Sequence, residues 1–476
     1  MNEDLLRKMR EGERLSVREQ VLLVFTLSIP AILAQISTII MQYIDASMVG
    51  CLDPDASAAV GLVVSTTWLT GGLCQAVCTG FTVRVAYRIG AGNERKARET
   101  VKYGVISVLF FSLCLMAIVL LVHRSLPIWI GGEPQICRDA SRYFLIYGFS
   151  LPFLQMVYIC GGMLQCSGDM KTPGILNILM CFLDIVFNFL LIVPCRTVNL
   201  HGISFFIPGA GRGVTGAALG TALAALCCAF LLIWNLLFRS SSLHLRKEES
   251  GSGLLYADVV KDMRVSVPVM ASAVIMGLAY IAGTHIVAPL GTIAIAANSF
   301  AVTAESICFM PCYGLAAAAT TCVGQAKGAE REPLMKRFGY LSVGLGMAVM
   351  VFMAFLLYLA APYMMAMLSP DPAVREAGTR VLRIIVYAEP LFGASIVAEG
   401  VFRGLGRTRI PTVLILLSMW CIRIPLCLVM ASRMGLTGVW IAEGIELCIR
   451  GLIFIVSLIK VNRQSGRKLD ISLSEQ

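Results

Sequence analysis

Apolar residues occur along this chain in long runs separated by short polar segments. Each run is close to the twenty or so residues that an α-helix needs to cross the hydrocarbon core of a bilayer. Glycine, proline and charged residues break the runs, as in the Gly-Gly-Glu-Pro stretch at 131–134. The pattern predicts twelve transmembrane helices, at about 21–44, 58–83, 101–122, 143–165, 174–194, 214–237, 265–289, 296–322, 339–361, 381–402, 411–431 and 436–459.

Two connections between the runs are longer than the others. Residues 194–213 alternate between apolar and polar positions, which predicts a small β-hairpin. The polar segment 239–264 contains Ser-Gly-Ser-Gly at 250–253 and is typical of a flexible linker. This linker lies midway along the chain and divides the runs into two sets of six.

An internal repeat relates the two halves. Prolines recur at an offset of 238 residues, and the offset falls to 222 between Gly216 and Gly438, so the first half has a longer connection. Six helices in each half make the repeat parallel, about an axis along the membrane normal, an arrangement found in secondary transporters. The repeated prolines are Pro30 and Pro268, Pro134 and Pro372, Pro152 and Pro390, and Pro173 and Pro411. The predicted parts are an N-terminal segment 1–20, an N-lobe 21–238, the linker 239–264, a C-lobe 265–459 and a tail 460–476.

Composition agrees with an all-α, multi-pass membrane protein. Hydrophobic residues make up 57% of the chain, charged residues 14%, and the mean hydropathy is +0.79. Soluble domains have about 45–50% apolar and about 25% charged residues. The net charge of +10 does not indicate a nucleic-acid partner, because most of the 39 Lys and Arg residues lie in the predicted connections and termini on one side. This bias predicts that both termini and the linker are cytoplasmic.

Two polar residues in the fifth run are the strongest functional candidates. Asp184 lies at the middle of the run, and Asn188 follows four residues later on the same helix face. A carboxylate at mid-bilayer is costly and usually faces a cavity, although a packing role with a neighbouring helix stays open. Asp45, near the outer end of the first run, fits an interfacial position as well as a functional one. Burial favours the protonated form of a carboxylate, which proton coupling requires.

The second half has its own buried charges. Glu305 is a candidate for substrate or cation binding, with packing an equal alternative. An arginine inside the membrane must find an acid, so Arg423 is predicted to form a structural ion pair with Glu443 or Glu446. Further acids in these runs are Glu389 and Glu399.

No pattern indicates bond-making chemistry. The chain lacks a Walker A motif, Gly-x-Ser-x-Gly and His-Glu-x-x-His. Its 17 cysteines are scattered without a Cys-x-x-Cys pair and are interpreted as small buried apolar residues. We therefore predict a non-enzyme with no cofactor and no metal site.

Several segments together resemble the multidrug and toxic compound extrusion (MATE) family along essentially the whole chain. One segment follows each of the first, second and eighth runs. Two further segments, which match each other, follow the fourth and the tenth runs. The segments are Ile44–Gly50 (Ile-Asp-Ala-Ser-Met-Val-Gly), Arg88–Asn93 (Arg-Ile-Gly-Ala-Gly-Asn), Val323–Ala329 (Val-Gly-Gln-Ala-Lys-Gly-Ala), Gly161–Pro173 and Gly400–Thr408.

The resemblance implies two six-helix lobes in a V shape that export organic, often cationic, compounds by antiport. In the bacterial DinF-like branch protons enter through the N-lobe, and the family's first-span and fifth-span acids fall on Asp45 and Asp184. Two departures favour protons over sodium. The Asn that often precedes the fifth-span Asp is Met180 here, and 269–287 lacks the seventh-span acid of sodium-coupled members. Glu305 or Glu389 stays open as a different C-lobe cation site.

Two other functions remain as alternatives. A lipid-linked oligosaccharide flippase of the same superfamily would favour extra spans or a strongly cationic central cavity, and neither is evident. A passive channel would more naturally repeat a filter sequence. We expect a monomer in the bacterial cytoplasmic membrane whose partners are small organic substrates and the bilayer, with a proton or, as the alternative, sodium as the coupling ion.

Overall fold

The computed structural model describes the chain apart from a few short segments. The described residues are 2–13, 15–50, 54–131, 133–192, 194–200, 203–240, 242–244, 256–369 and 371–474. The predicted Ser-Gly-Ser-Gly stretch at 250–253 lies outside them.

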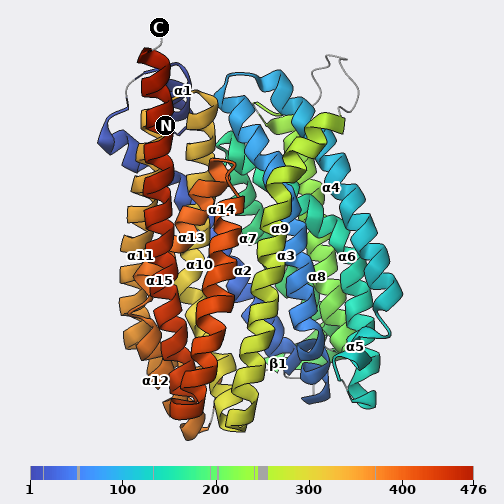
Figure 1. The fold of residues 1–476 in the computed structure, drawn as a ribbon. Helices are drawn as coiled ribbons and strands as arrows, with labels where there is room; N and C mark the ends of the chain where they lie inside the picture. Colours follow the sequence, from blue (N-terminus) through green and yellow to red (C-terminus); the bar gives the residue numbers. More distant parts are fainter. Residues whose placement is uncertain are drawn as a thin grey trace. The chain divides into compact units, whose positions relative to one another are not determined.

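Helices dominate both halves, as predicted (Figure 1). In the first half they are α1 (Asn2–Arg10), α2 (Val17–Gly50), α3 (Pro54–Gly90), α4 (Glu94–Val122), α5 (Leu126–Trp129), α6 (Pro134–Ser167), α7 (Lys171–Ile192) and α8 (Gly213–Trp234), which a π-helical turn, η1 (Asn235–Arg239), extends. In the second half they are α9 (Tyr256–Val287), the 3₁₀ turn η2 (Ala288–Leu290), α10 (Thr292–Gly328), α11 (Glu332–Leu368), α12 (Pro372–Ile385), α13 (Glu389–Gly404), α14 (Arg409–Leu416), the π-helical η3 (Leu417–Arg423) and α15 (Ile424–Ser474).

The helices account for all twelve predicted spans. Within the described residues, ten helices are long and apolar enough to cross a membrane, and α12 with α13, bent by 63°, makes eleven. One of the ten covers 409–463, 55 residues, which would be about 80 Å long if straight. It contains two predicted runs, and Gly435 between them has φ 59° and ψ −140°, a conformation that glycine adopts readily. This segment therefore supplies two spans joined by a turn.

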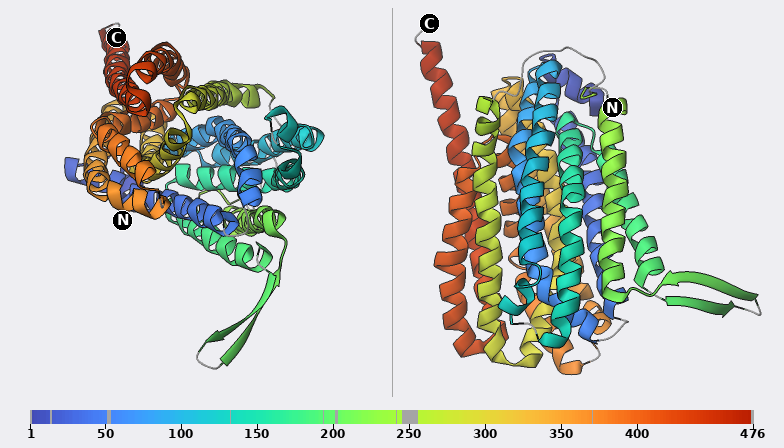
Figure 2. Two further views of the ribbon diagram at one scale, coloured as in Figure 1. Left: turned by 90° about the horizontal axis from the view of Figure 1, so that it is seen from below. Right: turned by 90° about the vertical axis from the view of Figure 1, so that its right-hand side faces the viewer.

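The predicted hairpin is also confirmed. Strands β1 (Pro194–Leu200) and β2 (Ile203–Ala210) pair antiparallel, with Leu200 opposite Ile203 and an irregularity between Pro194 and Arg196. Figure 2 shows the hairpin extending away from the helices that it connects, α7 and α8. It occupies the place where the offset of the repeat shortens.

The repeated prolines have related structural positions with one exception. Pro134 and Pro372 each lie in the first turn of a helix, where a missing N–H costs nothing, and Pro30 and Pro268 each lie inside a helix. Pro152, in contrast, lies inside the continuous α6. Its repeat partner Pro390 follows the break between α12 and α13.

The chain forms two compact units. One consists of 36–85 and 94–266, and the other of 1–35, 86–93 and 267–476. In the first unit α8 packs against both α6 and α7, and in the second α10 packs against α11 and α13. We call them the first-half unit and the second-half unit; the lobe boundaries predicted from the sequence stay a prediction.

Candidate functional site

The first-half unit brings Asp45, Asp184 and Asn188 together. Asp45 belongs to α2, which continues as a helix to Gly50, so this acid does not lie in a turn. The Nδ2 of Asn188 donates to Asp45 Oδ1 at 2.8 Å and to Asp184 Oδ2 at 3.0 Å. One amide group therefore holds two carboxylates that are 139 positions apart in the sequence.

Close helix packing creates the space for this cluster. Gly220 on α8 faces Asn188, and a Cβ atom at this position would lie 2.0 Å from Asn188 Oδ1. Any larger residue would displace the amide. Gly216, one turn earlier, has the backbone of Leu191 at 2.5 Å from its ideal Cβ position. The spacing of these two glycines is the small-xxx-small pattern of close membrane helix pairs, a sequence signal that could have identified Gly220.

An apolar cluster lies one helical turn beyond Asp45 and Asn188 along their helices. Val49, Ile192 and Ala217 are buried together and join the end of α2 to α7 and α8. Tyr143 of α6 packs against the same group and lies close to both carboxylates. Tyr143 was not among the predicted site residues, because a tyrosine inside a span has no distinctive sequence pattern.

The cluster has unused hydrogen-bonding capacity. Asp184 and Asn188 are fully buried, and Asp184 Oδ1 and Asn188 Oδ1 have no hydrogen-bond partner of ordinary geometry. Among the described residues, no lysine or arginine forms an ion pair with Asp45 or Asp184. Buried polar atoms are normally hydrogen-bonded. The arrangement can therefore accept a proton or a small cation that supplies the missing partner.

The second-half unit has a different set of buried acids. Glu305 on α10 and Glu389 at the start of α13 are both buried, and their carboxyl groups lie close together. Both oxygens of Glu389 lack a hydrogen-bond partner of ordinary geometry. These two glutamates are the residues that sequence analysis left open as a C-lobe site.

Arginines pair with two other buried acids of this unit. Arg423 forms an ion pair with Glu443, the first of its two predicted partners, and its guanidinium lies 5.7 Å from the ring centre of Tyr280. Glu446 instead contacts Ser418 and lies 3.2 Å from Arg450 Nε. Arg450, one helical turn after Glu446, was missed by the sequence analysis, although its i,i+4 spacing is a recognisable signal.

Comparisons with known proteins agree with this organisation. The model of the MatE family matches residues 30–190 and 268–429, two segments that begin at the offset of the repeat. A protein of Thermotoga maritima named "Probable multidrug resistance protein NorM" is 26% identical over 443 residues, 90% of this chain and 91% of the relative. A protein of the same name from Bacillus anthracis is 24% identical over 467 residues, 94% of this chain and 96% of the relative.

Solved structures share the fold at low identity. A crystal structure of MATE in complex with MaL6 matches with a TM-score of 0.86 and 18% identity, over 97% of this chain and 99% of that one. A MOP superfamily transporter from Pyrococcus furiosus matches with a TM-score of 0.85 and 18% identity, over 96% of this chain and 97% of its own.

Proposed function

The chain belongs to the MatE family, and we propose that it exports small organic compounds, often cationic ones, in exchange for protons. Its relatives named as multidrug resistance proteins support the export of drug-like compounds. The single observation that carries the proton part is the cluster in which Asn188 bridges Asp45 and Asp184.

Electrostatics explains why this cluster suits a proton. Two neighbouring carboxylates away from water repel each other, so a state in which the pair holds a proton is favoured over one with two charges. The unpartnered Asp184 Oδ1 provides a position for that proton. No buried cation competes for the site among the described residues.

Exchange of substrate for protons results if the proton and the substrate have opposite effects at one site. Protonation removes negative charge and lets the helices repack, whereas loss of the proton restores a negative site that attracts a cation. Each ligand then favours a different conformational state, and a ligand shifts an equilibrium only by its difference in affinity for the states. If the site opened to the two sides of the membrane in turn, the proton and the substrate would be carried in opposite directions, which is antiport.

The test separates the coupling ion from the export activity. Export of the cationic dye ethidium is measured in inside-out vesicles with a pH gradient and then with a sodium gradient. Addition of dye to the purified protein in detergent should release protons. If sodium alone drove export and no proton were released, the proton part of the proposal would fail while export itself stood.

We also propose that both termini are cytoplasmic and that the host membrane is the bacterial cytoplasmic membrane. The Lys and Arg bias of the sequence supports this orientation. A protease site inserted at 250–253 should be cut in inside-out vesicles and protected in intact cells. Cleavage from outside intact cells would reverse the orientation.

A further inference from the structure

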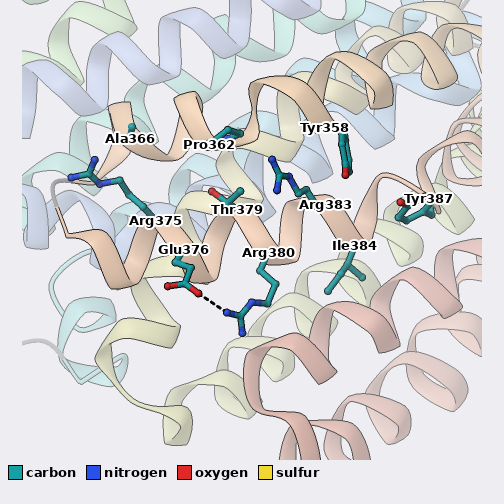
Figure 3. A pocket seen from close by; sticks show the side chains of 10 residues that line it. All are labelled: Tyr358, Pro362, Ala366, Arg375, Glu376, Thr379, Arg380, Arg383, Ile384 and Tyr387. Atoms are coloured by element: carbon teal, nitrogen blue, oxygen red, sulfur yellow. Dashed lines mark hydrogen bonds and ion pairs between the residues drawn. The ribbon is translucent and has the colours of Figure 1, made fainter.

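An exposed pocket lies between α11 and α12 of the second-half unit (Figure 3). It has a volume of about 650 Å³ and is open to the surface. Helix α12 is amphipathic, with Val374, Val381 and Leu382 buried, so its polar face is directed outward and lines the pocket. No residue of the buried acidic clusters contributes to it.

Positive charge is concentrated on this face. Arg375, Arg380 and Arg383 line the pocket within nine residues of sequence, against one acid, Glu376. In the proposed orientation they lie on the outer side of the membrane, where Lys and Arg are scarce in this chain. The positive-inside rule therefore does not account for them.

Arg380 and Arg383 retain capacity for a ligand. Arg380 Nη2 lies 2.8 Å from Glu376 Oε1, an exposed pair that contributes little on its own. Arg383 forms no ion pair among the described residues, and its guanidinium lies 5.1 Å from the ring centre of Tyr358. This cation–π contact positions the group while leaving its N–H donors available. Guanidinium groups match the geometry of phosphate oxygens.

An apolar surface continues from the pocket along α11. Phe352, Phe355 and Leu359 are 60%, 60% and 53% exposed and follow helical spacing toward Tyr358 and Pro362 in the pocket wall. In a chain that spans a bilayer, such a surface faces lipid chains. Charge beside a lipid-facing apolar strip fits an amphiphile better than a free anion.

The internal repeat provides a natural comparison. At the offset of 238 residues, Arg380 corresponds to Arg142, but Arg383 corresponds to Leu145 and Tyr358 to Leu120. The first half therefore lacks the aromatic and second arginine that build the pocket. The pocket is a feature of the second half and is not required by the shared fold.

We propose that this pocket binds the phosphate group of an anionic phospholipid. Arg380 and Arg383 contact the phosphate oxygens, Tyr387 at the exposed end of the pocket donates from its hydroxyl, and the acyl chains lie along Phe355 and Leu359. Glu376 opposes binding, because its carboxylate competes with phosphate for Arg380.

Native mass spectrometry of the purified full chain in detergent tests the proposal, with phosphatidylglycerol, phosphatidylcholine and inorganic phosphate as separate probes. Phosphatidylglycerol should bind in preference to phosphatidylcholine. An arginine near a membrane surface is worth roughly fivefold in affinity for anionic lipid, so Arg380→Gln/Arg383→Gln should weaken phosphatidylglycerol binding roughly thirtyfold. The matched control Arg142→Gln should bind like the parent.

A second variant keeps the test independent of folding losses. Glu376→Gln removes the competing charge and should strengthen phosphatidylglycerol binding by roughly fivefold. Unchanged or weaker binding by Glu376→Gln, or equal losses in Arg142→Gln and the double variant, would overturn the proposal. If inorganic phosphate displaced phosphatidylglycerol at equal concentration, the pocket would be a free-anion site and the lipid assignment would be wrong. Ethidium export by Glu376→Gln should match the parent, which separates this site from the coupling cluster.

Discussion

Each unit has a cluster of buried acids with its own kind of partner, and one further buried acid of the first-half unit, Asp262, pairs with Arg84. In the first-half unit, Asp45 and Asp184 share the amide of Asn188 and form no ion pair among the described residues. In the second-half unit, Glu443 and Glu446 each face an arginine. The repeat gave both halves the same helix order, yet it did not give them the same charges.

Whether a buried acid has an arginine partner indicates which of two roles its charge has, proton coupling or fixing helices together. When a buried acid has no cation beside it, the electrostatic free energy of its site changes strongly as it gains or loses a proton. Such an acid can therefore respond to the proton gradient. An acid paired with arginine is already balanced, and removing one partner leaves an uncompensated charge. We therefore assign coupling to the first-half cluster and helix fixation to the arginine pairs.

The largest expected effect is the loss of coupling in the first-half unit. Asp45→Asn and Asp184→Asn should each reduce pH-gradient-driven ethidium export in vesicles to background, because the exchangeable charge is removed. Protein amount in the membrane and thermal unfolding should match the parent. A double variant that still exported dye and released protons would disprove the assignment.

Breaking an arginine pair should lower stability. Arg423→Gln leaves Glu443 buried without its partner, which typically costs about 3–5 kcal/mol. Thermal unfolding in detergent measures the loss, and replacing both partners in Arg423→Met/Glu443→Leu should recover most of it. The exposed pair of Arg7 and Glu11 is the control, since Arg7→Gln should cost less than about 1 kcal/mol. Equal losses in the two single variants would contradict a structural role for Arg423.

Gly220→Ala should disturb the first-half cluster without removing an acid. The new methyl group would collide with Asn188 Oδ1, so the variant should resemble Asn188→Ala. Both should shift the pH dependence of ethidium export and keep part of the activity. Gly61→Ala is the matched control, because its Cβ would meet no atom within 4 Å. An altered pH profile in Gly61→Ala would contradict the explanation that the shift comes from the collision with Asn188 Oδ1.

The smallest effect is expected at Glu305. This acid is buried beside Glu389, in the unit where arginines pair with Glu443 and Glu446. Glu305→Gln should lower ethidium export a little and leave its dependence on the pH gradient intact. Complete loss in Glu305→Gln beside an active Asp45→Asn would move coupling to the second-half unit.

Hydrophobic spacing was sufficient to predict the spans, including the boundary near Gly435, because a bilayer demands long apolar helices. Hydrophobic spacing did not predict the break before Pro390. The repeat pairs Pro390 with Pro152, and Pro152 lies inside a continuous helix. A proline ring presses on the carbonyl four residues earlier. That residue is Gly148 in α6 and Val386 before α13. This residue alone does not decide the outcome, because Pro30 and Pro268 lie inside continuous helices with Thr26 and Arg264 four residues earlier.

The candidate site was predictable in its residue types and partly in its contacts. Helical spacing placed Asp184 and Asn188 on one face, but only tertiary packing shows that Asp45 of a distant helix reaches the same amide. The choice of Glu443 over Glu446 by Arg423 likewise depends on a competitor, Arg450. Pairings between distant helices depend on side-chain geometry that periodicity does not contain.

The β1–β2 hairpin has a consequence for imaging. Two halves with the same order of helices look alike at low resolution, so images of single particles can be aligned with the two halves exchanged. Within the described residues, the second half has only the turn at Gly435 in the corresponding place, whereas the hairpin extends away from its helices (Figure 2). It is a built-in orientation marker, and an antibody fragment raised against it would label one half of the molecule without contacting a membrane span.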